Sequence, residues 1–327
     1  CNRIGRLALT PSVDRREARG MSGLSYAIVG AGALGGLYGA RLHASGEDVH
    51  FLLNSDYEHV RSNGLLVESI WGDLNLSEVN AYASSSEMPA CDVVCVCLKT
   101  THNGLLSDLL PPLLRGGTVV LLMQNGLGGE DEVASAFPGV DVAGGLCYLC
   151  SNKVGPGHVR HLDYGRVTLA PFAAACGERL GAIAETFCRA GIPCTTDEDL
   201  LLARWKKLFW NVPFNGLTVA LGTETDQIMG CVETRRLAAA LMHDLRCGAE
   251  ACGHKIEEAY ISEMLDFTLR MKPYSPSMKL DYLAKRPLEL EYIYRRPIAA
   301  AQSAGQSMPC VETLASLLSF LDERNRA

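Results

Sequence analysis

Three hydrogen-bonding side chains interrupt an apolar stretch in the second half of the chain. Lys207, Asn211 and Asn215 are spaced four residues apart within residues 204–222, RWKKLFWNVPFNGLTVALG. Residues four apart share one face of a helix, so we expect them on one face of a buried helix. Buried polar groups are costly unless they find partners, which favours a ligand site over the alternative, a solvated stripe. A lysine in an apolar cleft, its pKa lowered by burial, can act as a general acid near neutral pH.

Two neighbours of these side chains carry further expectations. Lys206 is adjacent to Lys207, and because a helix turns by about 100° per residue it should face elsewhere, toward solvent. Pro213 lies inside the same stretch and removes a helical hydrogen bond. The sequence therefore predicts a kink at Pro213.

A glycine-rich turn near the start of the chain is the second chemical feature. Residues 26–42, YAIVGAGALGGLYGARL, join an apolar strand pattern to a helix start, and the glycines fall at the G-x-G-x-x-G spacing. Such a turn brings the free N–H groups of a helix N-terminus to a pyrophosphate. An ordinary structural turn is the alternative, which the strand before and the helix after disfavour. The expected cofactor-binding residues of this turn are Gly30, Ala31, Gly32, Ala33, Leu34 and Gly35.

Polar residues close three further expected strands. Residues 48–54, 92–98 and 118–123 each have a strand-like apolar pattern. Ligands of open α/β sheets bind beyond the carboxyl ends of the strands. We therefore expect the residues that end these strands, Asn54, Lys99 and Asn125, to line a cofactor cleft; a solvated lysine and an Asn-Gly turn are the alternatives for the last two.

Five stretches in order resemble the 2-dehydropantoate 2-reductase (ketopantoate reductase) family, from about Ser25 to the C-terminus. They are GAGALGG from Gly30, LKT at 98–100, QNGLG at 124–128, K-x-x-x-N-x-x-x-N from Lys207, and Ser277-Met278 with Asp281 and then Glu289. The resemblance implies a Rossmann domain followed by a helical domain of the 6-phosphogluconate dehydrogenase C-terminal type, with the active site between them.

The resemblance also implies residue roles. Lys207 matches the catalytic lysine, and Glu289, expected in a helix over 288–293, matches an acidic residue beside it that would orient the ammonium. Substrate-holding positions match Asn211, Asn215, Ser277 and Asn125, and cofactor-side positions match Lys99 and, again, Asn125.

The resemblance further implies hydride transfer from NADPH to the ketone of ketopantoate. Asn54 stands where members commonly have an arginine for the 2′-phosphate, which leaves NAD open as a cofactor. Two other functions stay as alternatives: reduction of another branched 2-keto acid on the same scaffold, and a non-catalytic NADP(H)-binding sensor.

The elements that must position these residues fall into two expected domains. Residues 22–197 should form an α/β doubly wound, mainly parallel sheet, and residues 198–327 a helical domain that carries the substrate and catalytic residues. Within the first domain we expect short strands and turns over 144–172 and a helix over 178–190. In the second, residues 234–252 and 310–324 have long amphipathic patterns.

Composition limits the partners. The chain has 327 residues, 48% of them hydrophobic and 20% charged, and a formal net charge of −7, which argues against nucleic acid or an anionic membrane as the main partner. No apolar run approaches the roughly 18 residues of a membrane helix. We expect a cytoplasmic enzyme with a small-molecule substrate, with a homodimer as one option for its assembly.

The thirteen cysteines are scattered through apolar segments, which favours buried reduced thiols. Cys147 and Cys150, followed by His158 and His161, are the one set of residues near the spacing of metal ligands. The interval between the cysteines and the histidines is shorter than in the usual zinc sites, so we expect no metal.

Residues 1–21 contain several arginines and end at Met21. We expect this leader to be disordered or non-native, with a transit peptide as the alternative.

Overall fold

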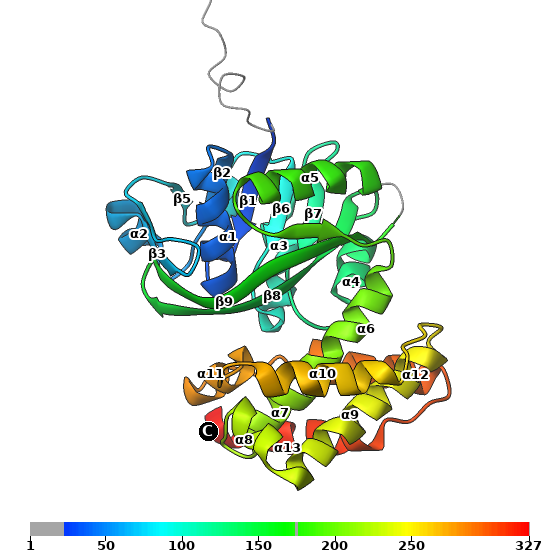
Figure 1. Cartoon of the computed structure of the whole chain (residues 1–327). Coiled ribbons are helices and arrows are strands. Elements are labelled where there is room, and N and C mark those ends of the chain that lie inside the picture. The colour runs from blue at the N-terminus through cyan, green and yellow to red at the C-terminus, as the bar shows by residue number, and fades with distance from the viewer. Residues whose placement is uncertain (1–22, 174–175, 327) are drawn as a thin grey trace, which may run out of the picture.

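The computed structural model describes residues 23–173 and 176–326, so the expected leader lies outside the described residues. A sheet with its covering helices forms one part and a group of helices forms the other. Figure 1 shows the two parts stacked, with α6 (Leu200–Trp210) running from the first into the second.

The first part contains a ten-stranded sheet in the order β4-β3-β9-β8-β7-β6-β1-β2-β5, with β10 paired to β9. Of the nine strand pairings among the described residues, seven are parallel, so the expected mainly parallel sheet is confirmed. The strands are β1 (Ser25–Val29), β2 (Asp48–Leu52), β3 (Leu65–Ser69), β4 (Leu74–Leu76), β5 (Asn80–Tyr82), β6 (Val93–Val96), β7 (Val119–Leu122), β8 (Asp141–Gly155), β9 (His158–Pro171) and β10 (Cys194–Thr196).

Helices cover both faces of this sheet because its central strands are apolar on both. In β1, Tyr26 and Ile28 pack in one hydrophobic cluster, and Ala27 and Val29 pack in another on the opposite face. The first cluster includes side chains of α1 (Ala33–Ala44) and α5 (Gly177–Arg189), and the second includes side chains of α3 (Leu106–Leu109) and α4 (Gly129–Ala136). The short α2 (Tyr57–Asn63) follows β2. The doubly wound fold is confirmed.

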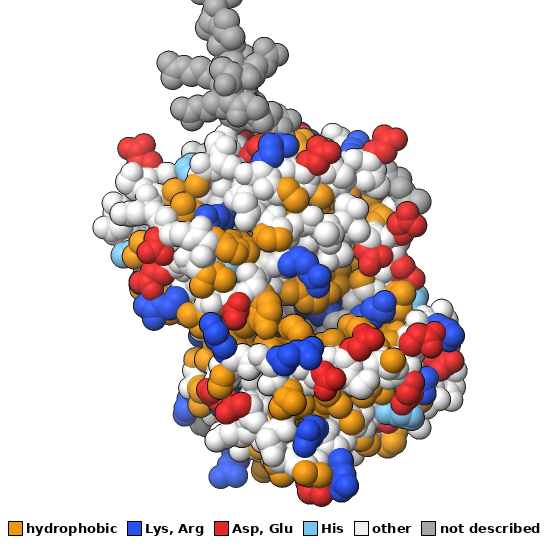
Figure 2. All heavy atoms as spheres, in the orientation of Figure 1, with side chains coloured by type: hydrophobic (Ala, Val, Ile, Leu, Met, Phe, Trp, Pro, Cys, Tyr) orange, Lys and Arg blue, Asp and Glu red, His pale blue; other side chains and the backbone are white. Residues whose placement is uncertain are grey.

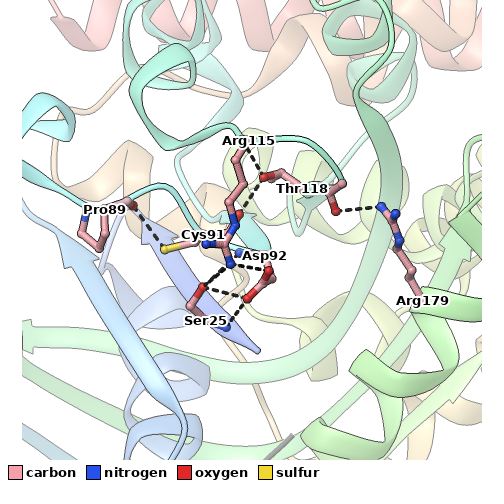
Figure 3. Close-up of polar contacts among 8 residues, drawn as sticks. Ser25, Pro89, Cys91, Asp92, Arg115, Thr118 and Arg179 are labelled. Atoms are coloured by element: carbon pink, nitrogen blue, oxygen red, sulfur yellow. Dashed lines mark hydrogen bonds and ion pairs between the residues drawn. The ribbon is translucent and has the colours of Figure 1, made fainter. Parts of the chain in front are cut away.

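The two edges of the parallel strands differ in their polar contacts. At the amino edge, Asp92 accepts hydrogen bonds from the backbone N–H of Ser25 at 2.8 Å and from its hydroxyl at 2.9 Å, and it pairs with Arg115. The hydroxyl of Thr118 donates to the carbonyl oxygen of Cys91 at 2.7 Å. Figure 3 shows these side chains bonded to one another across the starts of β1, β6 and β7. At the amino edge these polar side chains thus satisfy one another. The carboxyl edge is the one that faces the helical part.

The expectation of short strands and turns over residues 144–172 is wrong. This region forms two long antiparallel strands, β8 and β9, paired from Ala143 with Pro171 to Gly155 with His158. The pairing has register shifts at three places, including Tyr148/Leu149 and Cys150/Ser151. Each shift breaks the alternation with period two that identifies a strand. The sequence pattern of one long strand is therefore typical of several short strands.

The second part is helical: the described residues after Thr196, where β10 ends, contain no strand. The expected helices over 234–252 and 310–324 are present as α9 and α13. The helices are α6, α7 (Gly216–Ala220), α8 (Thr225–Gly230), α9 (Val232–Ala251), α10 (Ala259–Arg270), α11 (Ser277–Leu283), α12 (Arg296–Ser303) and α13 (Pro309–Arg326). Their apolar faces share one core. In the part of the chain that the structure describes, no helix is long and apolar enough to cross a membrane.

Two π-helical turns interrupt this part. One, Asn211–Asn215, lies between α6 and α7 and contains Pro213, so the break expected there takes the form of a widened turn. The other, Glu291–Arg295, precedes α12. The expected helix over 288–293 does not include Glu289, which has no regular secondary structure and lies just before the turn.

Candidate active site

A cavity of about 1200 Å³ lies between the carboxyl edge of the sheet and the helical part, and residues of both line it. Figure 2 shows a hollow at the border between the two parts, with basic side chains around it. The volume exceeds the roughly 300–1,000 Å³ of a typical small-molecule site. The cavity is therefore large enough for a dinucleotide together with a small substrate.

The glycine turn forms one wall of this cavity. Gly30 has a φ of +98°, which favours glycine, and a Cβ on Gly35 would lie 2.3 Å from the carbonyl oxygen of Gly30. A Cβ on Gly32 would meet no atom within 4 Å, so that glycine borders open space. Ala31, Ala33 and Leu34 line the cavity with Gly30 and Gly32.

The N-terminus of α1 is open to an anion. The helix begins at Ala33 with neither a capping side-chain hydrogen bond nor an acidic residue in its first turn. Its first N–H groups and its dipole can therefore serve a phosphate. These features fit a dinucleotide pyrophosphate.

The residues that end the strands line the same cavity. Asn54 follows β2 and is exposed, and Asn125 follows β7 and is half-buried. The loop after β7 is held by Gln124, whose side-chain amide donates to the carbonyl oxygen of Leu98 at 2.9 Å and to Asn103 at 2.6 Å. The strand ends therefore bring together residues that are far apart in the sequence.

Lys207 lies on α6 with 8% of its surface exposed, and it also lines the cavity. Its Nζ donates a hydrogen bond of 2.6 Å to the carbonyl oxygen of Cys147 and lies 5.0 Å from the centre of the Tyr148 ring. An ammonium has three N–H donors, so this arrangement leaves capacity for a substrate oxygen. Burial lowers the pKa of Lys207 to about 8.

Glu289 does not hold the Lys207 ammonium, contrary to the expectation. Its carboxylate accepts hydrogen bonds from the backbone N–H and the hydroxyl of Thr100, both at 2.9 Å, and lies 3.2 Å from Nζ of Lys99. Nζ of Lys99 is also 2.8 Å from Asp281. Because Glu289 precedes its helical turn, it reaches the end of β6, where three donors are available.

These contacts keep both Lys99 and Glu289 charged. Burial alone would raise the pKa of Glu289, but Lys99 and Thr100 outweigh it and the pKa is lowered. Burial alone would lower the pKa of Lys99, but Glu289 and Asp281 raise it. Lys99 still exposes 40% of its side chain to the cavity region, so it is neither the solvated lysine of the alternative nor fully free for a cofactor.

The remaining predicted substrate residues line the same cavity as Lys207. Asn211, Asn215 and Ser277 line the cavity, and the two asparagines are buried. Nδ2 of Asn211 is buried without a hydrogen-bond partner in the described structure. A buried unpaired donor beside a cavity suits a ligand oxygen.

Lys206 departs from its expectation. It is half-buried, it lines the same cavity, and its Nζ lies 5.9 Å from the centre of the Tyr260 ring. A long lysine side chain can pack its methylene groups against apolar surface, and Lys206 thereby reaches the cavity wall.

Sequence reasoning missed two groups of residues. Arg204 is buried, pairs with Glu130, and donates to the carbonyl oxygens of Gln124 at 2.6 Å and of Leu122 at 3.0 Å. A charged residue in the apolar stretch 204–222 was the available signal. The other group is an aromatic wall, for which sequence offers no signal because such residues also fill cores: Tyr148, Trp210, Tyr260, Phe267 and Tyr274.

The cysteines and histidines considered as metal ligands make contacts with other groups. The Cys147 thiol donates to the carbonyl oxygen of Gly145, and the ring of His161 contacts Ser69 at 2.9 Å. Twelve cysteines in the described ranges are free thiols. Within those ranges no group of three or more His, Cys, Asp or Glu side chains could hold a metal ion.

Comparisons with known proteins agree with this geometry. Residues 26–174 match the family model "Ketopantoate reductase PanE/ApbA", and residues 199–322 match its C-terminal counterpart. The chain is 51% identical over 311 residues to a 2-dehydropantoate 2-reductase of Nostoc sp., covering 94% of this chain and 98% of the relative.

Solved structures agree as well. A 2-dehydropantoate 2-reductase from Geobacter metallireducens superposes with a TM-score of 0.88 at 45% identity, over 90% of this chain and 99% of that one. A D-mandelate dehydrogenase solved with NADH and anilino(oxo)acetate shares the fold, with a TM-score of 0.87 at 19% identity over 93% of this chain and all of that one. The chain thus belongs to the ketopantoate reductase family.

Proposed function

We propose that this protein reduces 2-dehydropantoate (ketopantoate) to pantoate with NADPH, by hydride transfer to the 2-keto carbon. Membership of the family supports the reaction class. The observation that carries the proposal is the buried Lys207 ammonium, which faces the cavity with one hydrogen bond to Cys147 and has a pKa lowered by burial to about 8.

The cofactor, when bound, supplies the hydride. The glycine turn and the open N-terminus of α1 would bind its pyrophosphate, and Asn54, Lys99 and Asn125 line the same cavity.

Lys207 donates the proton. As negative charge develops on the keto oxygen, the ammonium stabilises it and transfers one proton, which leaves an alcohol and a neutral amine that solvent reprotonates. Asn211, Asn215 and Ser277 bind the carboxylate and hydroxyl of the substrate without adding charge, and Asn125 completes that set.

Glu289 acts as a positioning residue in this proposal. It fixes Lys99 and the start of the segment after β6, and its charge raises the pKa of Lys207 against the effect of burial. We further propose that residue 197 divides the chain into a cofactor domain and a catalytic helical domain. We also propose that the protein forms a homodimer, which sedimentation analysis tests.

The test is NADPH oxidation by the purified protein with ketopantoate and a panel of other 2-keto acids, followed at the NADPH absorbance. The expected result is the highest kcat/KM for ketopantoate. A higher kcat/KM for another branched 2-keto acid would make that compound the substrate. Tight NADPH binding with no turnover on any keto acid would favour the non-catalytic sensor.

A further inference from the structure

The loop after β2 lacks the charge that a 2′-phosphate requires. In dinucleotide-binding folds the residue closing this strand faces the adenosine ribose. Here Asn54, Ser55 and Asp56 follow the strand and line the cavity. Asn54 is neutral, so neither it nor Ser55 supplies a cation.

Asp56, the acid of this loop, is already occupied. It is 5% exposed, and its carboxylate accepts hydrogen bonds from Lys153 at 2.6 Å, from the N–H of Gly157 at 2.9 Å and from the hydroxyl of Ser55 at 3.1 Å. A carboxylate has about four acceptor positions, and three are taken. Asp56 therefore has little capacity left for the ribose 2′-hydroxyl, the contact by which an acid at this strand end selects NAD.

Lys153 reaches this loop from β8. That strand passes the start of α1, where the hydroxyl of Ser151 donates to the carbonyl oxygen of Ala33 at 3.2 Å. No register shift separates Ser151 from Lys153, so the two side chains lie on one face of the strand, toward the cavity that both line. Lys153 gives one N–H to Asp56 and keeps 37% of its side chain exposed.

The other lysines and arginines of the cavity wall are engaged elsewhere. Among the cavity residues that the structure describes, Lys99 pairs with Asp281 and Glu289, Lys206 lies over Tyr260, and Lys207 and Arg166 lie over Tyr148. Lys153 is the one whose ion pair lies in the loop after β2.

We propose that Lys153, held in place by Asp56, binds the adenosine 2′-phosphate and so selects NADP(H) in the absence of an arginine at position 54. This inference rests on the proposed NADPH-dependent function and names the residue responsible for the choice of cofactor. The ammonium contributes its two remaining N–H groups to the phosphate oxygens as charge-assisted hydrogen bonds.

Calorimetric titrations of Lys153→Met test the proposal without any catalytic turnover. The ligands are two pairs that differ by the 2′-phosphate: NADP+ with NAD+, and adenosine 2′,5′-bisphosphate with 5′-AMP. The variant should bind the phosphorylated member of each pair about 10-fold or more weakly, because a charge-assisted hydrogen bond is lost. Binding of the other member should change by less than about twofold, and Lys153→Arg should retain the wild-type preference.

Lys255→Met is the matched control, since Lys255 also forms an ion pair, at 2.9 Å with Glu257, on the exposed surface of the helical part. It should leave all four affinities unchanged. Equal losses for both members of each pair, or no loss for either, would overturn the proposal and leave the Lys153–Asp56 pair a support of the loop. If Lys153→Met does not fold, loss of the preference in Lys153→Arg would overturn it. These titrations contain no keto acid, so their outcome does not depend on whether the protein reduces ketopantoate. Failure of this proposal and failure of the proposed function can therefore be told apart.

Discussion

Lys207 is buried, donates a hydrogen bond to the carbonyl oxygen of Cys147 and lines the cavity. If it protonates the keto oxygen, Lys207→Ala should lower kcat by about 10²- to 10⁴-fold, the range for loss of a general acid. NADPH affinity should change little, because the glycine turn lies in the other part of the molecule. Steady-state rates and NADPH fluorescence titrations measure both quantities.

The control for that variant is a lysine outside the cavity. Lys206, the neighbour on the same helix, is unsuitable because it also lines the cavity. Lys255→Ala serves instead and should keep wild-type rates. Near-normal turnover in Lys207→Ala would rule out the assigned role.

The pKa of Lys207 gives a pH dependence with a defined sign. Reduction consumes the proton of the ammonium, which is present below the pKa of about 8 and lost above it. We therefore expect kcat/KM for reduction to be level up to about pH 8 and then to fall about tenfold per pH unit. A pH profile that rises through this range would contradict the assignment of Lys207 as the acid.

At the scale of elements, the unit of β1, the glycine turn and α1 depends on close packing. A Cβ on Gly35 would lie 2.3 Å from the carbonyl oxygen of Gly30 and 2.9 Å from the Ile28 side chain. Gly35→Ala should push α1 away from β1, destabilise the protein by about 1–3 kcal/mol and weaken NADPH binding. Urea unfolding and NADPH titration measure the two effects.

Gly181→Ala in α5 is the matched control, because a Cβ there would meet no atom within 4 Å. That change should be neutral or stabilise by up to about 1 kcal/mol, since alanine has the higher helix propensity. The same loss in both variants would contradict the packing argument for Gly35.

The π-helical turn Asn211–Asn215 matters at the same scale. It separates α6 from α7 while keeping Lys207, Asn211 and Asn215 on the wall of one cavity. Widened turns of this kind occur frequently at functional sites. Pro213 within the turn lacks the N–H that a regular helix would use, which explains why the helix departs from α geometry here.

At the scale of the whole molecule, Arg204 links the helical part to the part that contains the sheet. It extends from α6 to Glu130 on α4 and to two carbonyl oxygens at the end of β7, and its side chain is 2% exposed. Arg204→Met should destabilise the protein by about 3–5 kcal/mol, because it leaves the buried Glu130 carboxylate without its partner. Urea unfolding measures the loss.

The comparison for this variant is Arg236→Met. Arg236 pairs with Glu233 at 3.1 Å with 73% of its side chain exposed, and exposed pairs contribute little. This variant should unfold like the wild type. Equal destabilisation of the two variants would show that burial does not determine the effect.

Local features of the sequence determined much of the fold. The parallel strands at β1, β2, β6 and β7, the glycine turn and the long helices follow from periodicities of two and 3.6 residues and from breakers, which depend on neighbours along the chain. For the same reason the sequence does not predict β8 and β9 as long strands, since their register shifts interrupt the period of two. Asn125 and Asn211, predicted from strand ends and helix spacing, lie on the cavity wall.

Only the tertiary structure decided which charged groups meet. Glu289 binds Lys99 and Thr100 instead of Lys207, Arg204 joins Glu130, and Lys153 reaches Asp56. These partners are 74 to 190 residues apart in sequence. No spacing rule predicts such pairs, because the burial and donor geometry that select them exist only once the sheet and the helices have packed together.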